Sequence, residues 1–151
     1  MNNINFDKDW LCEAIKLAAE YHSTQKDLGG DYYILHPLRV MHKVEHIDEK
    51  IVAVMHDLIE DTKLTIDDIK NKGFNENICD ALICLTKQKS EIYENYIKRI
   101  SDNKIATIVK IADLEDNMNI MRLISPIHEK DFTRLSKYLE AWLFLNSFTR
   151  R

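Results

Sequence analysis

Four ionisable side chains directly follow an apolar segment near the middle of the chain. Residues 51–55 read IVAVM, and His56, Asp57, Glu60 and Asp61 come next. In one continuous helix, His56 and Glu60 would share a face, and so would Asp57 and Asp61. Such groups are unfavourable near a core unless they are paired or bind a cation, because neighbouring carboxylates repel one another. We therefore expect a cation site. The alternative, a solvated acidic cluster, belongs at the start of a helix, whereas this one falls at its end.

A second polar segment repeats this pattern later in the chain. The mostly apolar residues 105–112 lead into Asp113, and Asn117 lies one helical turn further on. Asp113 continues the apolar side of the predicted helix, so we interpret it as functional. Glu115 and Asp116 are interpreted instead as part of a solvated acidic face.

A third candidate segment lies upstream, where His36 precedes Pro37. Proline favours the first helical position and pushes the preceding residue out of the helix, so we expect His36 at a helix mouth. Two imidazoles and two carboxylates suit Mn²⁺, Fe²⁺, Zn²⁺ or Ni²⁺ and leave positions open for water and phosphate oxygen. Glu60 and Asp61 would then bind and deprotonate a water. The predicted metal ligands are His36, His56, Asp57 and Asp113.

The other histidines have competing interpretations. His42 and His46 are four residues apart and could form a metal pair, but only Glu45 accompanies them, so a surface location is favoured. His22 could face a substrate or be a hydrogen-bonded packing residue. We expect His128 at the surface.

Composition excludes several classes of protein. The chain has 151 residues, 45% of them apolar, and a formal net charge of −4. This balance favours one globular domain over 1–151 and gives no indication of nucleic-acid binding. The sequence has no membrane-spanning run, and residues 1–5 lack a signal-peptide pattern. Three cysteines without a CxxC spacing (Cys12, Cys79 and Cys84) indicate reduced core residues in a cytoplasmic protein.

The apolar spacing predicts helices that bring these side chains together. No segment alternates convincingly with a period of two, so we expect an all-α fold. Asp7 and Asp48 are candidate caps for the first and third helices, and Thr65 with Asp68 resembles a capping box before a helix that Gly73 ends. The expected helices are about 6–25, 37–46, 48–61, 65–73, 76–87, 91–101, 105–123 and 129–148.

Three motifs at this spacing resemble a known family. They are YILHPLRV at 33–40, HDLIEDT at 56–62, and VKIAD at 109–113 followed by Asn117-Met118. The pattern resembles HD-domain metal-dependent phosphohydrolases. It is most similar to the hydrolase domain of RelA/SpoT-type alarmone enzymes and their short stand-alone relatives, the small alarmone hydrolases. The resemblance covers about 14–123, and the helix at about 129–148 is expected to pack on this HD-type helical bundle.

This resemblance implies an activity and further site residues. Such enzymes use one divalent ion, usually Mn²⁺, to release pyrophosphate from the 3′ position of (p)ppGpp, which leaves GDP or GTP. The four predicted ligands would hold that ion, and Glu60 and Asp61 would position and activate the water. The small-molecule nucleotide substrate would be bound by Lys26, Tyr33, Arg39, Lys110 and Asn117.

The chain departs from the longer members of this family around the substrate. Leu114, Asp116 and Asn119 stand where those members commonly have basic or aromatic residues, and the loop at 29–32 is short and lacks a proline before Tyr33. Two rival hypotheses follow. One is an HD hydrolase for another nucleotide, such as an adenosine alarmone, a nucleoside monophosphate or NADPH. The other is a non-catalytic HD module that binds a nucleotide.

Overall fold

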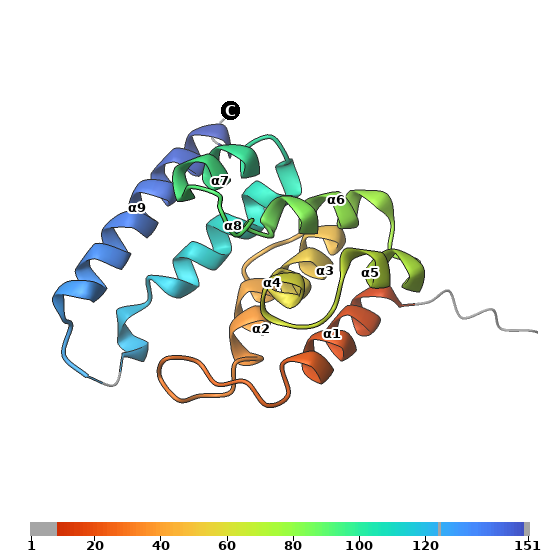
Figure 1. Ribbon diagram of the computed structural model, residues 1–151, viewed down its shortest axis with the longest axis horizontal. Coiled ribbons are helices and arrows are strands. Elements are labelled where there is room, and N and C mark those ends of the chain that lie inside the picture. Colours follow the sequence, from red (N-terminus) through yellow and green to blue (C-terminus); the bar gives the residue numbers. More distant parts are fainter. Residues whose placement is uncertain (1–8, 124, 150–151) are drawn as a thin grey trace, which may run out of the picture.

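The computed structural model describes residues 9–123 and 125–149, and in these ranges it contains helices but no strand (Figure 1). An isolated bridge between Lys26 and Tyr32 is the nearest approach to sheet structure there. The predicted all-α fold is confirmed. The helices are α1 (Trp10–Tyr21), α2 (Leu35–His42), α3 (Ile47–Met55), α4 (Leu58–Asp61), α5 (Ile66–Lys72), α6 (Glu76–Leu85), α7 (Tyr93–Ile100), α8 (Lys104–Asn117), the 3₁₀ turn η1 (Ile120–Arg122) and α9 (Glu129–Thr149).

Helix α3 lies at the centre of the core. Its residues 51–55 are all buried, with exposed fractions of at most 2%. A helix that is apolar on every side must be covered on every side. Accordingly, α3 packs against α1, α2, α6 and α8. This central position brings the end of α3, which His56 directly follows, close to both α2 and α8.

Helices α8 and α9 form the other side of the molecule, where they pack along each other (Figure 1). Helix α7 contacts both of them. The segment between α1 and α2 loops out below α2 in the same view, and its Asp27 pairs with Arg122 of η1 at 3.3 Å. Residues of this loop, of α8 and of α9 line one cavity.

The predicted continuous helix over 48–61 is wrong, because α3 ends at Met55 and α4 begins at Leu58. The His56 Nδ1 lies 2.7 Å from the carbonyl oxygen of Ala53. In a continuing helix that carbonyl would pair with the N–H of Asp57, so the imidazole competes with the helix for it. The resulting turn replaces the shared faces that we expected for these side chains.

Other boundaries differ more modestly. The expected cap Asp7 and residues 6–8 of the first helix lie outside the described residues; Asp9 caps α1 by accepting from the Cys12 N–H. His46 takes the N-cap position of α3, with Asp48 in its first turn. Pro37 is the third residue of α2. The predicted helix over 105–123 ends at Asn117, and η1 follows.

Several smaller predictions can be compared directly. Thr65 and Asp68 form the predicted capping box, and Gly73 ends α5 with φ +96°. Cys79 is buried, but Cys84 is half-buried and Cys12 is exposed, so the core assignment of Cys12 is wrong; all three thiols are free. Across residues 9–123 and 125–149, none of the helices has the length and apolar character required to span a bilayer.

Candidate metal centre and active site

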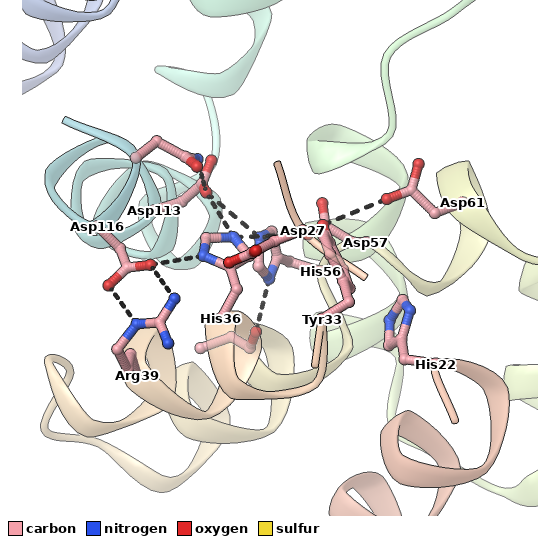
Figure 2. A network of polar contacts seen from close by, with 12 residues as sticks. His22, Asp27, Tyr33, His36, Arg39, His56, Asp57, Asp61, Asp113 and Asp116 are labelled. Carbon is pink, nitrogen blue, oxygen red and sulfur yellow. Dashed lines mark hydrogen bonds and ion pairs between the residues drawn. The ribbon is translucent and has the colours of Figure 1, made fainter. Parts of the chain in front are cut away.

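The structure brings the four predicted ligands together from three separate elements. His36 lies in the first turn of α2, His56 and Asp57 form the turn between α3 and α4, and Asp113 lies in α8. The Nε2 atom of His36 is 3.1 Å from Asp113 Oδ1 and 3.7 Å from Asp57 Oδ2. The Nε2 atom of His56 is 3.0 Å from Asp57 Oδ2 and 3.5 Å from Asp113 Oδ1. Both Nε2 atoms and one oxygen of each carboxylate therefore face a common point (Figure 2).

The outer nitrogen of His36 is fixed by a carboxylate that the sequence analysis placed at the surface. Asp116 is 2% exposed, and its Oδ2 accepts from His36 Nδ1 at 2.7 Å. Arg39 holds the same carboxylate from the other side, through Nε at 2.9 Å and Nη2 at 3.1 Å. Since Nδ1 must carry the proton, Nε2 of the neutral ring has a free lone pair directed at the site.

His56 is oriented in the same way by the backbone. Its Nδ1 donates to the Ala53 carbonyl, and its Nε2 is buried without a hydrogen-bond partner among the described residues. A buried acceptor without a donor is unfavourable unless another ligand completes it. Histidines that bind a metal typically donate a hydrogen bond from the other ring nitrogen, here Nδ1, and so leave Nε2 free. The observed residues therefore fit a divalent cation, and His36, His56 and Asp57 each offer a ligand atom within 4.8 Å of the others.

Electrostatics also indicate that a positive charge belongs here. Burial lowers the pKa of His56, but the Asp57 and Asp113 carboxylates outweigh this and raise the pKa well above its ordinary value. Burial likewise opposes the charge on Asp57 and Asp113, yet the neighbouring cationic groups hold the pKa of each below its usual range. Protons on the imidazoles thus compensate the carboxylates in the absence of a metal ion, and such an ion would replace them.

Asp113 has two further contacts within α8. Lys110 Nζ lies 2.8 Å from its Oδ2, and Asn117 Nδ2 donates to its Oδ1 at 2.6 Å. Burial lowers the pKa of Lys110, but Asp113 more than offsets this and raises it well above the ordinary value. Lys110 therefore stays cationic beside the ligand set.

The two predicted water-activating carboxylates take different positions. Tyr33 Oη donates its hydrogen to Asp57 Oδ2 at 2.5 Å, and Asp61 Oδ2 lies 3.3 Å from the same hydroxyl, so Tyr33 links Asp61 to the ligand set. Burial, then Asp57 and Glu60, raise the pKa of Asp61. Glu60 is exposed and accepts from the backbone N–H of Lys87 at 3.0 Å.

A cavity of about 450 Å³ opens beside the ligand set, within the range of small-molecule sites. Of the predicted substrate-binding residues, four line it and Arg39 does not, because Arg39 lies behind His36 against Asp116. Four basic and three acidic side chains are among the lining residues. Lining residues with polar side chains are Lys26, Asp27, Tyr33, His36, Asp57, Lys110, Asp113, Asn117, Asn119, Arg122, Arg134 and Tyr138.

Sequence reasoning missed several of these positions. Arg134 and Tyr138 are four residues apart on one face of α9, which is a signal for a shared surface but carries no indication of what it faces. Asp116 lies three residues after Asp113 on the same face of α8, a spacing that could have indicated a buried partner for the ligands. Arg122 reaches the cavity from η1, where it pairs with Asp27 at 3.3 Å.

Comparison with known proteins places this site in context. No family model matches the chain. It is 33% identical over 120 residues to a guanosine-3′,5′-bis(diphosphate) 3′-pyrophosphohydrolase of Aquifex aeolicus, an alignment that covers 72% of this chain and 17% of that protein. A probable enzyme of the same name from Synechocystis is 25% identical over 146 residues, which cover 87% of this chain and 19% of the relative. The chain belongs to the RelA/SpoT-type HD-domain family.

Other relatives carry a different name. A GTP pyrophosphokinase of Brucella ovis is 32% identical over 126 residues, covering 74% of this chain and 17% of that protein. The chain thus spans less than a fifth of the length of these RelA/SpoT-type relatives. A solved structure, described as a metazoan orthologue of SpoT that hydrolyses ppGpp and plays a role in starvation responses, matches with a TM-score of 0.69 at 21% identity. The match covers 96% of both chains, so it extends the shared fold to nearly the whole helical bundle.

Proposed function

We propose that this protein is a metal-dependent phosphohydrolase that removes pyrophosphate from the 3′ position of (p)ppGpp. The observation that carries the proposal is the pair of imidazole Nε2 atoms, both freed by outer hydrogen bonds, which face two carboxylates at the wall of a cavity. His36, His56, Asp57 and Asp113 would hold one divalent ion, with Mn²⁺ as our first choice and Fe²⁺, Zn²⁺ or Ni²⁺ as alternatives. Such an ion supplies a Lewis acid for the phosphoryl oxygen and activates water.

The cavity fits a polyphosphate nucleotide although the whole chain is acidic. Lys26, Lys110, Arg122 and Arg134 are among its lining residues. They outnumber the acidic ones there, and a divalent ion would add two positive charges. Cations placed around a transferring phosphoryl group stabilise the charge that develops in the transition state. The 450 Å³ volume leaves room for a nucleotide part, which Tyr138 and Asn117 would contact.

Asp61 is the better placed of the two predicted water-activating carboxylates. It shares the Tyr33 hydroxyl with Asp57, whereas Glu60 is bound to the Lys87 backbone. A general base must lie within hydrogen-bond reach of the proton that it accepts, directly or through one water. We therefore assign the proton-accepting role to Asp61 and a supporting role to Glu60. A cytoplasmic location and a small-molecule nucleotide as the partner accompany this proposal.

A nucleotide panel with purified, Mn²⁺-loaded protein tests the proposal. Incubation with ppGpp should yield GDP and pyrophosphate in equal amounts. Incubation with pppGpp should likewise yield GTP and pyrophosphate. The panel includes an adenosine alarmone, nucleoside monophosphates and NADPH as rival substrates. Orthophosphate release from the latter two would identify another HD hydrolase. Nucleotide binding by calorimetry without cleavage of any member would identify a non-catalytic module.

A further inference from the structure

A buried histidine lies beside the candidate site but outside its ligand set. His22 is the C-cap residue of α1 and is only 1% exposed. Its ring centroid is 5.0 Å from that of Tyr33, which in turn contacts Asp57 and Asp61 through its hydroxyl. Figure 2 shows His22 across Tyr33 from the two histidines of the site. Burying the polar nitrogens of an imidazole is unfavourable, and an apolar side chain could fill the same space without that cost. We therefore expect the imidazole to have a specific role.

The hydrogen bonds around Gln25 fix which nitrogen of His22 carries a proton. The Gln25 amide nitrogen donates to the backbone carbonyl of Asp61 at 3.1 Å. This carbonyl can only accept, so the Gln25 amide cannot be turned around. Its oxygen Oε1 therefore faces His22 Nδ1, at 2.7 Å. It follows that Nδ1 bears a hydrogen whether the ring is neutral or charged, while Nε2 has no partner among the described residues.

The hydrogen bonds from His22 through Gln25 end on α4, the helix that contains Asp61. Helix α4 has four residues, and a single helical turn is not stable alone in water. The carbonyl of its last residue, Asp61, has no partner within so short a helix. Gln25 supplies that partner from the loop after α1. The Asp61 side chain is held separately, by Tyr33 at 3.3 Å.

We propose that His22 is a positioning residue that acts through Gln25 to hold Asp61 in the place where it can accept a proton. The inference rests on the proposed hydrolysis for its catalytic meaning. His22 Nδ1 orients the Gln25 amide, and the amide anchors the backbone of Asp61. Loss of the donor at Nδ1 frees the Gln25 side chain to rotate and loosens the end of α4, while the four metal ligands keep their own contacts.

Two substitutions of His22 distinguish the two ring nitrogens. In His22→Asn the amide nitrogen can take the place of Nδ1, whereas in His22→Gln it reaches the place of Nε2. We expect His22→Asn to keep kcat within about threefold. His22→Gln should lower kcat by about 10–100-fold, the range typical of residues that orient a catalytic group through a hydrogen bond. Bound metal and KM should change by less than about twofold in both. His42→Gln, at an exposed histidine, is the matched control.

A second measurement does not depend on activity. Amide hydrogen exchange at Asp61 and Thr62 should be faster in His22→Gln and in Gln25→Met than in wild type and His22→Asn, while exchange in α6 stays unchanged. If wild type hydrolyses no nucleotide, the proposed function fails, and the exchange pattern still decides whether His22 anchors α4.

Several outcomes would overturn the inference. One is a rate of amide hydrogen exchange at the end of α4 that is the same in His22→Gln as in wild type. Another is an equal loss of kcat in His22→Asn and His22→Gln. A uniform increase of exchange over all helices, with a lower melting temperature, would show that His22 only supports packing.

Discussion

The candidate metal centre and the Arg99 cluster are two partly buried groups of charges, and their polar atoms find partners in different ways. Arg99 binds Glu91 through two contacts of 2.8 Å and donates to the carbonyls of Ile83, Cys84 and Thr86 at the end of α6. Its nitrogens thus all have partners within the protein. In the candidate metal centre the outer atoms are paired, but the inner nitrogens and oxygens face one another, and His56 Nε2 has no hydrogen-bond partner among the described residues.

This difference is the one expected between a structural cluster and a metal site. A charged group that only stabilises the fold gains most when each donor finds an acceptor. A metal site must keep lone pairs free, so its hydrogen bonds are confined to the outer side of each ligand. Four substitutions test this contrast, beginning with the largest expected effect.

Replacing Asp113 should abolish metal binding at the candidate centre. In Asp113→Ala one carboxylate ligand is lost and Lys110 loses its partner, so metal content after desalting should fall close to zero. Turnover should fall by roughly 10²–10³-fold, the scale for loss of one strong electrostatic element. Elemental analysis checks this, with the exposed Asp80→Ala as the control. A full equivalent of metal in Asp113→Ala would contradict the ligand assignment.

Replacing Asp116 should weaken the centre without removing a ligand. Asp116→Asn removes the charge that orients His36 and pairs with Arg39. We expect metal affinity to fall by about 10–100-fold, as for other residues that support ligating histidines. Calorimetric titration of the metal-free protein measures it, and Glu115→Gln, the exposed neighbour, is the control. Equal affinities in the two variants would return Asp116 to the solvated face that its sequence position suggested.

Replacing Arg134 should affect the substrate and spare the metal. Arg134 reaches the cavity from α9, where it also pairs with Asp131 at 3.0 Å. Arg134→Gln should raise KM about tenfold, the equivalent of one lost charge-assisted hydrogen bond, at unchanged metal content. Steady-state kinetics check it against Lys130→Gln, an exposed neighbour. An unchanged KM would mean that the substrate phosphates do not approach α9.

Replacing Glu91 should affect stability alone. Glu91→Gln should lower the free energy of unfolding by about 1–2 kcal/mol near neutral pH, since one charged partner is removed. The hydrogen bonds from Arg99 lower the pKa of Glu91 from 4.5 to about 2. Because the pKa is lowered in the folded protein, the Glu91 carboxylate stabilises the fold fully above the unfolded value of 4.5. This contribution is lost as the pH falls through about 2.

Urea unfolding at about pH 7 and about pH 2 measures the free energy of unfolding of wild type and Glu91→Gln. The difference between the two free energies should be smaller at the lower pH. Metal content and kcat should match wild type. A loss of turnover in this variant would remove the distinction between the two clusters.

The sequence predicted the fold well, because helical periodicity and capping depend on local residues. The Thr65 box and Gly73 are both local signals, and both are confirmed. The apolar run at 51–55 predicted a buried helical segment, and these five residues of α3 are all buried. The break after Met55 was missed, since a competing bond from the His56 ring to the Ala53 carbonyl leaves no trace in the hydrophobic pattern.

The site was predictable where motif and burial agreed, and less so where three-dimensional contacts decide. His36, His56, Asp57 and Asp113 each interrupt or continue an apolar face, and the structure brings them together. Arg39 was expected to bind substrate and Asp116 to lie on a solvated face, but the two pair with each other behind His36. Arg134 and Tyr138 lie far along the chain, and only the packing of α9 on α8 brings them to the cavity.

The origin of the cavity wall has an evolutionary consequence. Helix α9 contributes Arg134 and Tyr138 to the cavity but none of the four candidate ligands. If the chain has the proposed function, mutations that shift or replace this final helix will change which phosphate ester is admitted while the four candidate ligands stay in place. In the proposed hydrolase, specificity would then change through this one peripheral element, with the candidate ligands unaltered.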